Sequence, residues 1–166
     1  MDPVSQFFPE INRFFDHVYV ITLQRAAERH EHISRELAGL EYELFFGHDK
    51  NHFSIEELKL RRIYDEQLAI AHHRFGKPLV PGMIGCSWSH REVYEDIIRK
   101  NYRNALVLED DVVIDRKHMH LVHEILSEVP PDWELLYLGY ARNEKKPVLS
   151  TLKKLIYHIQ RLLRNH

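Results

Sequence analysis

The sequence contains one cysteine, Cys86, among its 166 residues. A single cysteine excludes an intrachain disulfide framework, so a reducing compartment is the natural expectation. No apolar run approaches the ~20 residues that a transmembrane helix needs. Residues 1–16 also lack the cationic start and apolar block of a secretory signal. From these absences we predict a cytoplasmic protein.

An excess of positive charge is also missing, since 23 Lys and Arg against 25 Asp and Glu leave a formal charge of −2. Without an overall basic field, nucleic acid is not an expected partner. Histidine is plentiful, and His118, His120 and His123 are its densest group. A closed zinc site needs four ligands, and no cysteine or carboxylate lies at zinc-finger spacing. We therefore interpret these three histidines as solvated surface residues.

The chain alternates strand-like and helix-like segments. Short apolar runs rich in β-branched and aromatic residues predict strands at 17–22, 43–46, 105–108 and 134–138. Helical spacing predicts helices at 26–40 with Gly39 as a stop, from the Ser54–Glu57 capping box to about 73, from 87 onward, and around 119–128. The prolines and glycines of 78–85 predict a loop. This order predicts an α/β fold with an open, mostly parallel sheet and helices on both faces.

In such sheets, ligands bind beyond the carboxyl ends of the strands. The strand 105–108 ends in three consecutive carboxylates, Glu109, Asp110 and Asp111. Neighbouring carboxylates repel one another and favour a divalent cation, and Mg²⁺ and Mn²⁺ prefer such oxygen ligands. The triplet on its own is equally consistent with a solvated acidic turn that caps the next helix.

Two further segments precede predicted helices. Gly82-Met-Ile-Gly-Cys-Ser-Trp-Ser-His90 has glycines that let backbone approach a ligand, and helical N–H groups that suit a phosphate. Thr22-Leu-Gln-Arg-Ala-Ala-Glu-Arg29 is a strand-to-helix turn with two arginines that could meet a phosphate. Taken alone, the first is equally a turn with an N-cap, and the second a pair of exposed surface arginines.

Together, these segments resemble glycosyltransferase family 25. The matching motifs run in order through Val20-Ile-Thr-Leu23 with Glu28-Arg29, Phe46-Gly-His-Asp49, Gly82 to His90, Ala105 to Val112, and Pro130 to Gly139. The specific part is the combination of Gly-Cys-x-x-Ser-His with Leu-Glu-Asp-Asp. Two positions depart from the family pattern, because Thr22 stands where Asn or Ser is usual and Lys50 replaces the glycine after Asp49.

The resemblance implies a GT-A-like fold that transfers galactose or glucose from a UDP-hexose to a lipooligosaccharide or lipopolysaccharide acceptor, with Mn²⁺ or Mg²⁺ as cofactor. It implies that Asp111 and Glu109 bind the metal. The donor-binding residues that it implies are Thr22, Leu23, Arg29, Asp49, Gly85, Ser89, His90, Glu109 and Asp110.

The domain organisation follows from the same match. We expect an N-terminal extension at 1–16, a nucleotide-sugar-binding domain at 17–140 and a basic amphipathic helical tail at 141–166. Family members continue beyond the point where this sequence stops, so the resemblance implies a fold truncated at its C-terminal side and a catalytic base outside these residues. The alternative function is a non-catalytic fragment that binds a nucleotide sugar.

The tail combines an apolar stripe at 149–163 with a basic face. Between Arg142 and His166, seven Lys and Arg stand against one acid, Glu144. Such a helix can lie in an anionic membrane interface, and the family's lipid-linked acceptors make peripheral contact with the inner membrane a reasonable expectation. The alternative is that the stripe packs against protein, as most amphipathic helices do.

Co-sedimentation with lipid vesicles separates these two interpretations. A membrane-docking tail predicts binding that requires anionic lipid and weakens at high salt, since each basic residue near the surface contributes about 1 kcal/mol. Binding that is indifferent to lipid charge would instead identify a helix whose stripe normally packs against protein.

Overall fold

The computed structural model describes residues 5–73 and 75–138. The chain divides into two compact units, Met1–Glu128 and Val129–His166. The strands are β1 His17–Thr22, β2 Glu43–Phe46 and β3 Ala105–Glu109. The helices are α1 Phe8–Phe14, α2 Ala27–Glu36, α3 Ile55–Leu60, α4 Glu66–His72, α5 Pro81–Arg99 and α6 Val122–Ser127, with short 3-10 turns at Ser5–Phe7 and Met119–Leu121. No helix in the described part of the chain is both long and apolar enough to cross a bilayer.

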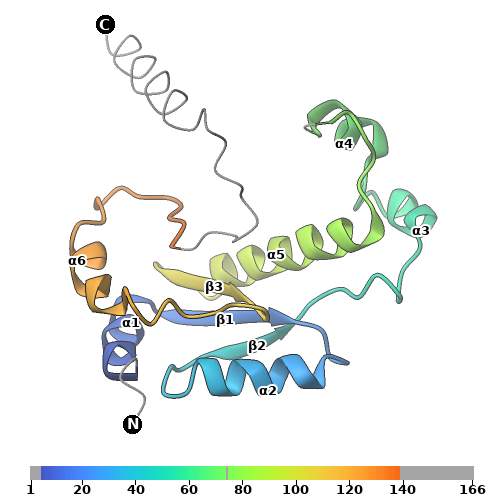
Figure 1. Ribbon diagram of the computed structural model, residues 1–166. Coiled ribbons are helices and arrows are strands. Elements are labelled where there is room, and N and C mark those ends of the chain that lie inside the picture. Colours follow the sequence, from blue (N-terminus) through green and yellow to red (C-terminus); the bar gives the residue numbers. More distant parts are fainter. Residues whose placement is uncertain (1–4, 74, 139–166) are drawn as a thin grey trace, which may run out of the picture. The chain divides into compact units, whose positions relative to one another are not determined.

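The strands form one parallel sheet in the order β2-β1-β3, which confirms the predicted α/β fold (Figure 1). Tyr19 of the central strand lies opposite Glu43 on one side and Val107 on the other. The neighbouring strands β2 and β3 cover both edges of β1, and helices cover its two faces. Most of β1 is therefore buried, including Val18, Tyr19 and Val20. This burial explains why its sequence is a continuous run of apolar and β-branched residues.

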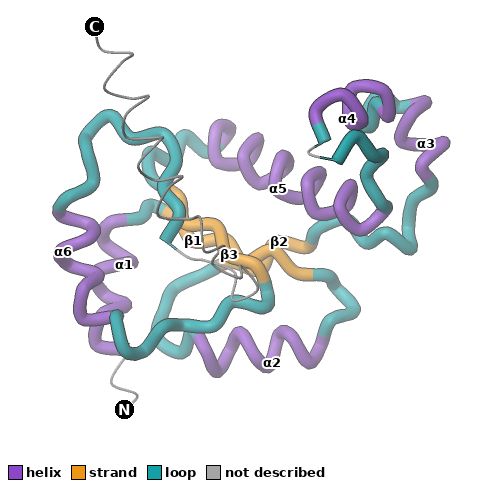
Figure 2. Tube along the Cα trace, turned by 45° about the horizontal axis from the view of Figure 1, so that its top comes forward, coloured by secondary structure: helices purple, strands orange, loops and turns teal. Residues whose placement is uncertain are grey.

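Helices α2 and α5 lie on opposite faces of the sheet (Figure 2). Helix α2 connects β1 to β2, whereas α5 precedes β3, which pairs with the other edge of β1. Connections between parallel strands are right-handed. The chain passes from β1 to β2 in one direction across the sheet and returns to β3 in the other, so the two connecting helices cover opposite faces. The point of reversal lies between β1 and β3.

A buried polar group fastens α5 to the central strand. The Tyr19 hydroxyl donates to Asp96 Oδ2 at 2.5 Å, and Lys100 Nζ lies 2.8 Å from the same oxygen. Burial, followed by the hydrogen bond to Asp96, raises the pKa of Tyr19 to about 12. The hydrogen bonds from Lys100 and Tyr19 hold the pKa of Asp96 well below its usual range. Asp96 is therefore a charged acceptor that positions the helix.

The N-terminal residues contribute to the same unit. Phe8 and Ile11 of α1 are buried, as is Phe15 just after it. Proline stands at the start of α1, where its missing N–H costs nothing. The segment 5–15 thus supplies apolar side chains to the fold.

One predicted helix is corrected. The helix expected from Ser54 to about residue 73 is two helices, although the Ser54 side chain does accept from Glu57 N–H. Arg62 adopts a positive φ of 55°, and Asp65 caps α4 by accepting from Leu68 N–H. The break lets Leu58 and Tyr64 bury together in one apolar cluster.

The loop expected at 78–85 is wrong from Pro81 onward, because α5 begins there. Proline at the first helical position has a suitable φ and needs no partner for its nitrogen. Gly82 and Gly85 are helical despite their low propensity, and Gly85 is buried. The helix predicted at 26–40 is α2, which ends earlier, at Glu36, and Gly39 adopts a φ of 103° in the turn that follows it.

The strand predicted at 134–138 is absent, and these residues have no regular structure. An apolar run becomes a strand only where a neighbouring strand accepts its backbone hydrogen bonds. The sheet of the first unit uses only β1, β2 and β3. The predicted tail at 141–166 lies outside the described residues.

A close backbone contact sets the distance between α5 and the loop after β2. A Cβ added to Gly85 would lie 2.5 Å from the His48 carbonyl oxygen, whereas one added to Gly82 would meet only Lys50 Cδ at 4.0 Å. The substitution Gly85→Ala should therefore destabilise the chain by about 1–3 kcal/mol through overpacking. Its helical neighbour Gly82→Ala should be neutral or stabilising, by up to about 1 kcal/mol.

Urea unfolding of the two variants and the parent chain measures this difference. Equal midpoints for Gly85→Ala and Gly82→Ala would contradict the close packing of α5 on the His48 carbonyl.

Candidate functional site

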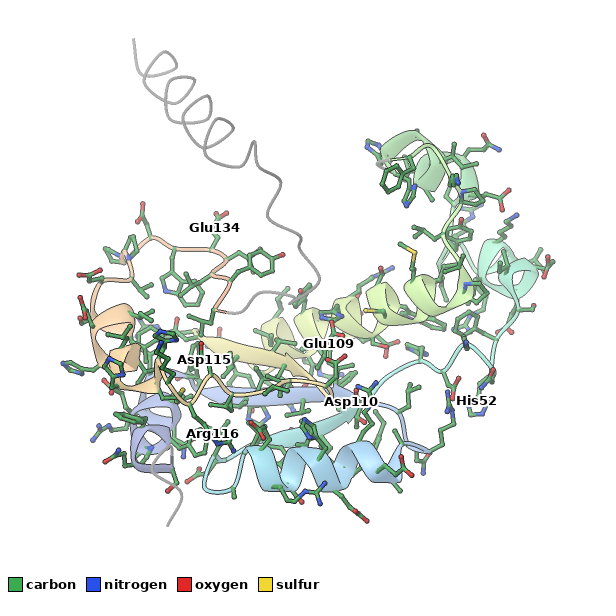
Figure 3. The ribbon with its side chains drawn as sticks, in the orientation of Figure 1. His52, Glu109, Asp110, Asp115, Arg116 and Glu134 are labelled. Carbon is green, nitrogen blue, oxygen red and sulfur yellow. The ribbon has the colours of Figure 1, made fainter. Side chains whose placement is uncertain are left out.

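A cavity of about 780 Å³ lies at the carboxyl ends of the strands. This edge of the sheet, at a point where the strand order reverses, is where open α/β sheets bind ligands. Figure 3 shows Glu109 and Asp110 at the end of β3. The cavity wall comes from the turn after β1, the loop after β2, the first half of α5 and the end of β3. Its lining residues are Ile21, Thr22, Leu23, Arg25, Ala26, Ala27, Glu28, Arg29, His48, Asp49, Lys50, Gly82, Cys86, Ser89, His90, Glu109 and Asp110.

Asp110 ties three elements together. Its Oδ2 accepts from the Thr22 hydroxyl at 2.7 Å and its Oδ1 accepts from Arg29 Nη1 at 2.8 Å. Its backbone N–H donates to the Ile21 carbonyl at 3.1 Å, which continues the ladder between β3 and β1. The Asp110 side chain is only 17% exposed, and the Arg29 guanidinium at 2.8 Å is its counter-ion. Asp110 thus links β1, α2 and β3.

Asp49 is the second anchored carboxylate. It is buried, and it accepts from Arg25 Nε and from the Asn51 backbone N–H. The hydrogen bond from Arg25 is the main cause that holds the pKa of Asp49 below its usual range. The same pair keeps Arg25 at the cavity wall, although its side chain is 58% exposed. Together with Arg29 and Lys50, it gives the cavity cationic groups beside the carboxylates.

Cys86 and His90 stand one helical turn apart on α5, and they meet Glu109 across the cavity wall. His90 Nδ1 lies 3.1 Å from the Cys86 carbonyl oxygen and 3.8 Å from its sulfur. His90 Nε2 lies 3.7 Å from Glu109 Oε1. Burial, then the nearby charges of Glu109 and Asp111, raise the pKa of the Cys86 thiol. The thiol is therefore protonated at neutral pH and is not an activated nucleophile.

Ser89 and Gly85 perform a packing role. The buried Ser89 hydroxyl donates to the Gly85 carbonyl at 2.7 Å and accepts from the His48 N–H at 2.8 Å. The His48 ring stacks on Trp88 at 3.4 Å, and its Nε2 lies 2.9 Å from Glu92 Oε1. These contacts fix the loop that carries Asp49 against α5.

The cavity brings together most of the residues expected to bind the donor. Thr22, Leu23, Arg29, Asp49, Ser89, His90, Glu109 and Asp110 line it, whereas Gly85 does not. Asp111, expected as a metal ligand, also lies outside the lining; its carboxylate is 67% exposed and 3.5 Å from Arg29 Nη1. Glu109, the other expected metal ligand, is in the wall and is 55% exposed.

The motifs did not place Arg25, His48, Lys50 or Cys86 among the expected donor-binding residues, although all four line the cavity. The two arginines of the turn after β1 were a usable signal for Arg25, but its partner Asp49 is 24 residues away in the sequence. The others lie beside residues that the motifs did identify.

Comparison with known proteins decides the family. The family described as "Glycosyltransferase family 25 (LPS biosynthesis protein)" matches residues 15–164. The chain belongs to glycosyltransferase family 25. The match covers the cavity and all three strands, and it confirms the resemblance carried by the motifs.

Relatives within family 25 include animal proteins. Procollagen galactosyltransferase 2 of Mus musculus is 30% identical over 156 residues, which is 88% of this chain and 25% of that protein. Procollagen galactosyltransferase 1-A of Xenopus laevis is 31% identical over 137 residues, 77% of this chain and 22% of that protein. The human protein named "Inactive glycosyltransferase 25 family member 3" is 27% identical over 82% of this chain and 23% of its own length. The chain thus spans about a quarter of each of these relatives.

Proposed function

We propose that the cavity binds a UDP-hexose together with Mn²⁺ or Mg²⁺, and that the chain serves transfer of galactose or glucose to a lipid-linked lipooligosaccharide or lipopolysaccharide acceptor. Membership of family 25, whose description refers to LPS biosynthesis, supports the reaction class and the acceptor. The names of the relatives, procollagen galactosyltransferases, support galactose as the sugar.

The observation that carries the proposal is the pairing of carboxylates with cationic groups at the strand ends. The cavity volume of about 780 Å³ falls within the ~300–1,000 Å³ usual for small-molecule sites. Arg25, Arg29 and Lys50 line it together with Glu109 and Asp110. A nucleoside diphosphate needs cationic partners for its phosphates, and a metal shared with those phosphates needs oxygen ligands.

The acidic triplet fits a divalent cation of this kind. Both Asp110 carboxylate oxygens accept hydrogen bonds, one from Thr22 and one from Arg29, whereas the carboxylates of Glu109 and Asp111 are exposed. We assign these two to the metal, and Asp110 to the nucleotide side with Thr22, Leu23 and Arg29. A bound Mn²⁺ or Mg²⁺ would neutralise the diphosphate leaving group. The chain's own groups would hold and orient the donor.

A second candidate function is donor binding without transfer. It is favoured by one observation, that a relative covering 82% of this chain is named inactive. The donor cavity is lined by residues between Ile21 and Asp110, and the Cys86 thiol among them is not an activated nucleophile, because its pKa is raised. Release of UDP from UDP-galactose or UDP-glucose by the purified chain, with and without an oligosaccharide acceptor, distinguishes the two functions.

UDP binding should require the metal. We expect a Kd of about 1 mM or tighter in the presence of Mn²⁺ or Mg²⁺, and no measurable binding with a chelator, because unscreened carboxylates would repel the diphosphate. Isothermal titration calorimetry under both conditions measures this. Equal affinity in the two titrations would remove the metal from the proposed function.

Asp111→Asn tests the assignment of the metal ligand. Loss of one carboxylate should weaken Mn²⁺-dependent UDP binding by one to two orders of magnitude, at about 1.4 kcal/mol per tenfold. Asp115→Asn is the matched control, because Asp115 is an exposed aspartate that pairs with His118. If both variants bind UDP like the parent chain, Asp111 is not a ligand.

A further inference from the structure

Three different metal-ligating side chains converge on one wall of the cavity. The ligand atoms of Cys86, His90 and Glu109 all lie within 4.8 Å of one another. The proposed donor function uses Glu109 but gives no role to the Cys86 thiol. A thiol, an imidazole and a carboxylate at this spacing form a ligand set that neither Mg²⁺ nor a sugar nucleotide requires.

The fold holds this group in place before any metal binds. Cys86 and His90 are four residues apart on α5, so their side chains lie on the same face of the helix. Glu109 ends β3, which pairs with β1, and α5 is fastened to β1 through Asp96 and Tyr19. The backbone positions of the three ligands are therefore determined by the core, whereas the exposed side chains of Cys86 and Glu109 can rotate.

The hydrogen bonding of His90 leaves one ring nitrogen available. The Cys86 carbonyl oxygen can only accept, so the 3.1 Å contact places the ring hydrogen on Nδ1. Nε2 then presents its lone pair 3.7 Å from Glu109 Oε1, which is also an acceptor. A backbone carbonyl that orients the second ring nitrogen is the usual support of a metal-binding histidine.

We propose that Cys86, His90 and Glu109 form a binding site for Zn²⁺, a cation that accepts sulfur, nitrogen and oxygen ligands together. Zinc bonds of about 2.0–2.3 Å require the group to contract from its present spread, which rotation of the exposed Cys86 side chain allows. Binding releases the thiol proton to solvent. Three protein ligands would leave a fourth coordination position for a water molecule or another ligand.

This site has a consequence for the donor cavity. Zinc bound by Cys86 and His90 also takes Glu109, which the proposed function assigns to Mn²⁺ or Mg²⁺. The two metals therefore compete for one carboxylate. Zinc at low concentration should reduce Mn²⁺-dependent UDP binding in the parent chain, and this inhibition should be weaker in Cys86→Ser.

Cobalt spectroscopy tests the site directly. Co²⁺ occupies zinc sites, and a thiolate ligand gives it a charge-transfer absorption in the near ultraviolet. Cys86 is the only cysteine in the sequence, so such a band in this chain reports Cys86 alone. We expect the band to appear with Co²⁺ and to disappear when Zn²⁺ displaces the cobalt. Absence of the band from the parent chain would overturn the proposal.

Variants test whether the three residues act as one site. His90→Gln and Cys86→Ser should each weaken Zn²⁺ binding at least about tenfold, since even supporting residues of a metal site contribute this much. The matched control is His72→Gln, an exposed histidine of α4 that should leave Zn²⁺ affinity unchanged. A cobalt band of full strength in His90→Gln would show that Cys86 binds metal without the cluster, and would overturn the site.

The proposed zinc site rests in part on the proposed donor site, through Glu109, but different variants test the two proposals. Asp111→Asn should lower Mn²⁺-dependent UDP binding and keep the cobalt band, because Asp111 is not one of the three ligands. Cys86→Ser should lose the cobalt band and keep Mn²⁺-dependent UDP binding in zinc-free buffer. Loss of UDP binding in that variant, with an unchanged circular dichroism spectrum, would place Cys86 in the donor site and overturn the assignment of a separate zinc site.

Discussion

The orientation of the acidic triplet depends on one carboxylate, Asp110. It receives hydrogen bonds from Thr22 and Arg29, and its own N–H extends the pairing of β3 with β1. Asp110 directly follows Glu109, the last residue of β3, so fixing Asp110 restricts the backbone that positions Glu109. Glu109 then lies in the cavity wall within reach of His90. An aspartate paired with an arginine thus positions the more exposed carboxylates on either side of it.

Helix α5 is held at two places, and both are needed for the cavity. Toward its C-terminal end, the Asp96 carboxylate accepts from Tyr19 and pairs with Lys100. Near its N-terminal end, Gly85 lets the His48 carbonyl approach, and the Ser89 hydroxyl accepts from the His48 N–H. The first contact ties the helix to the sheet and the second ties it to the loop of Asp49. Cys86 and His90 lie on the segment between them.

The parts of the fold that depend on local pattern could be predicted from the sequence. The apolar run 17–22 and the shorter run 43–46 are strands with the expected bounds. The first is a continuous apolar run because β1 is the buried central strand. The second is a partly exposed edge strand. The run 134–138 has the same character but is no strand. Strand formation requires a partner, and a single sequence does not reveal one. The helical start at Pro81 was hidden because glycine usually marks a loop, whereas here Gly85 serves a packing contact.

In the candidate site, too, features that depend on local sequence could be predicted, whereas tertiary contacts could not. The strand-end position of Glu109 and Asp110 follows from the sequence, and both residues line the cavity. The sequence does not reveal that Asp110 is the carboxylate of the triplet that bonds to Thr22 and Arg29, because these two residues lie more than 80 positions away. The contact between Arg25 and Asp49 and the meeting of Cys86 with Glu109 are tertiary in the same sense.

The strand order has a consequence for how the cavity is assembled during folding. Pairing of β1 with β2 closes a short loop, whereas β3 reaches β1 only after α5, and Thr22 and Asp110 are 88 residues apart. Contacts between distant segments form late because their loop-closure entropy is large. A partly folded chain with β1, α2 and β2 in place would carry Arg25, Arg29 and Asp49 but no acidic wall. The cavity gains Glu109 and Asp110 only when β3 pairs with β1, so binding of a ligand that needs these two carboxylates reports completed folding of the sheet.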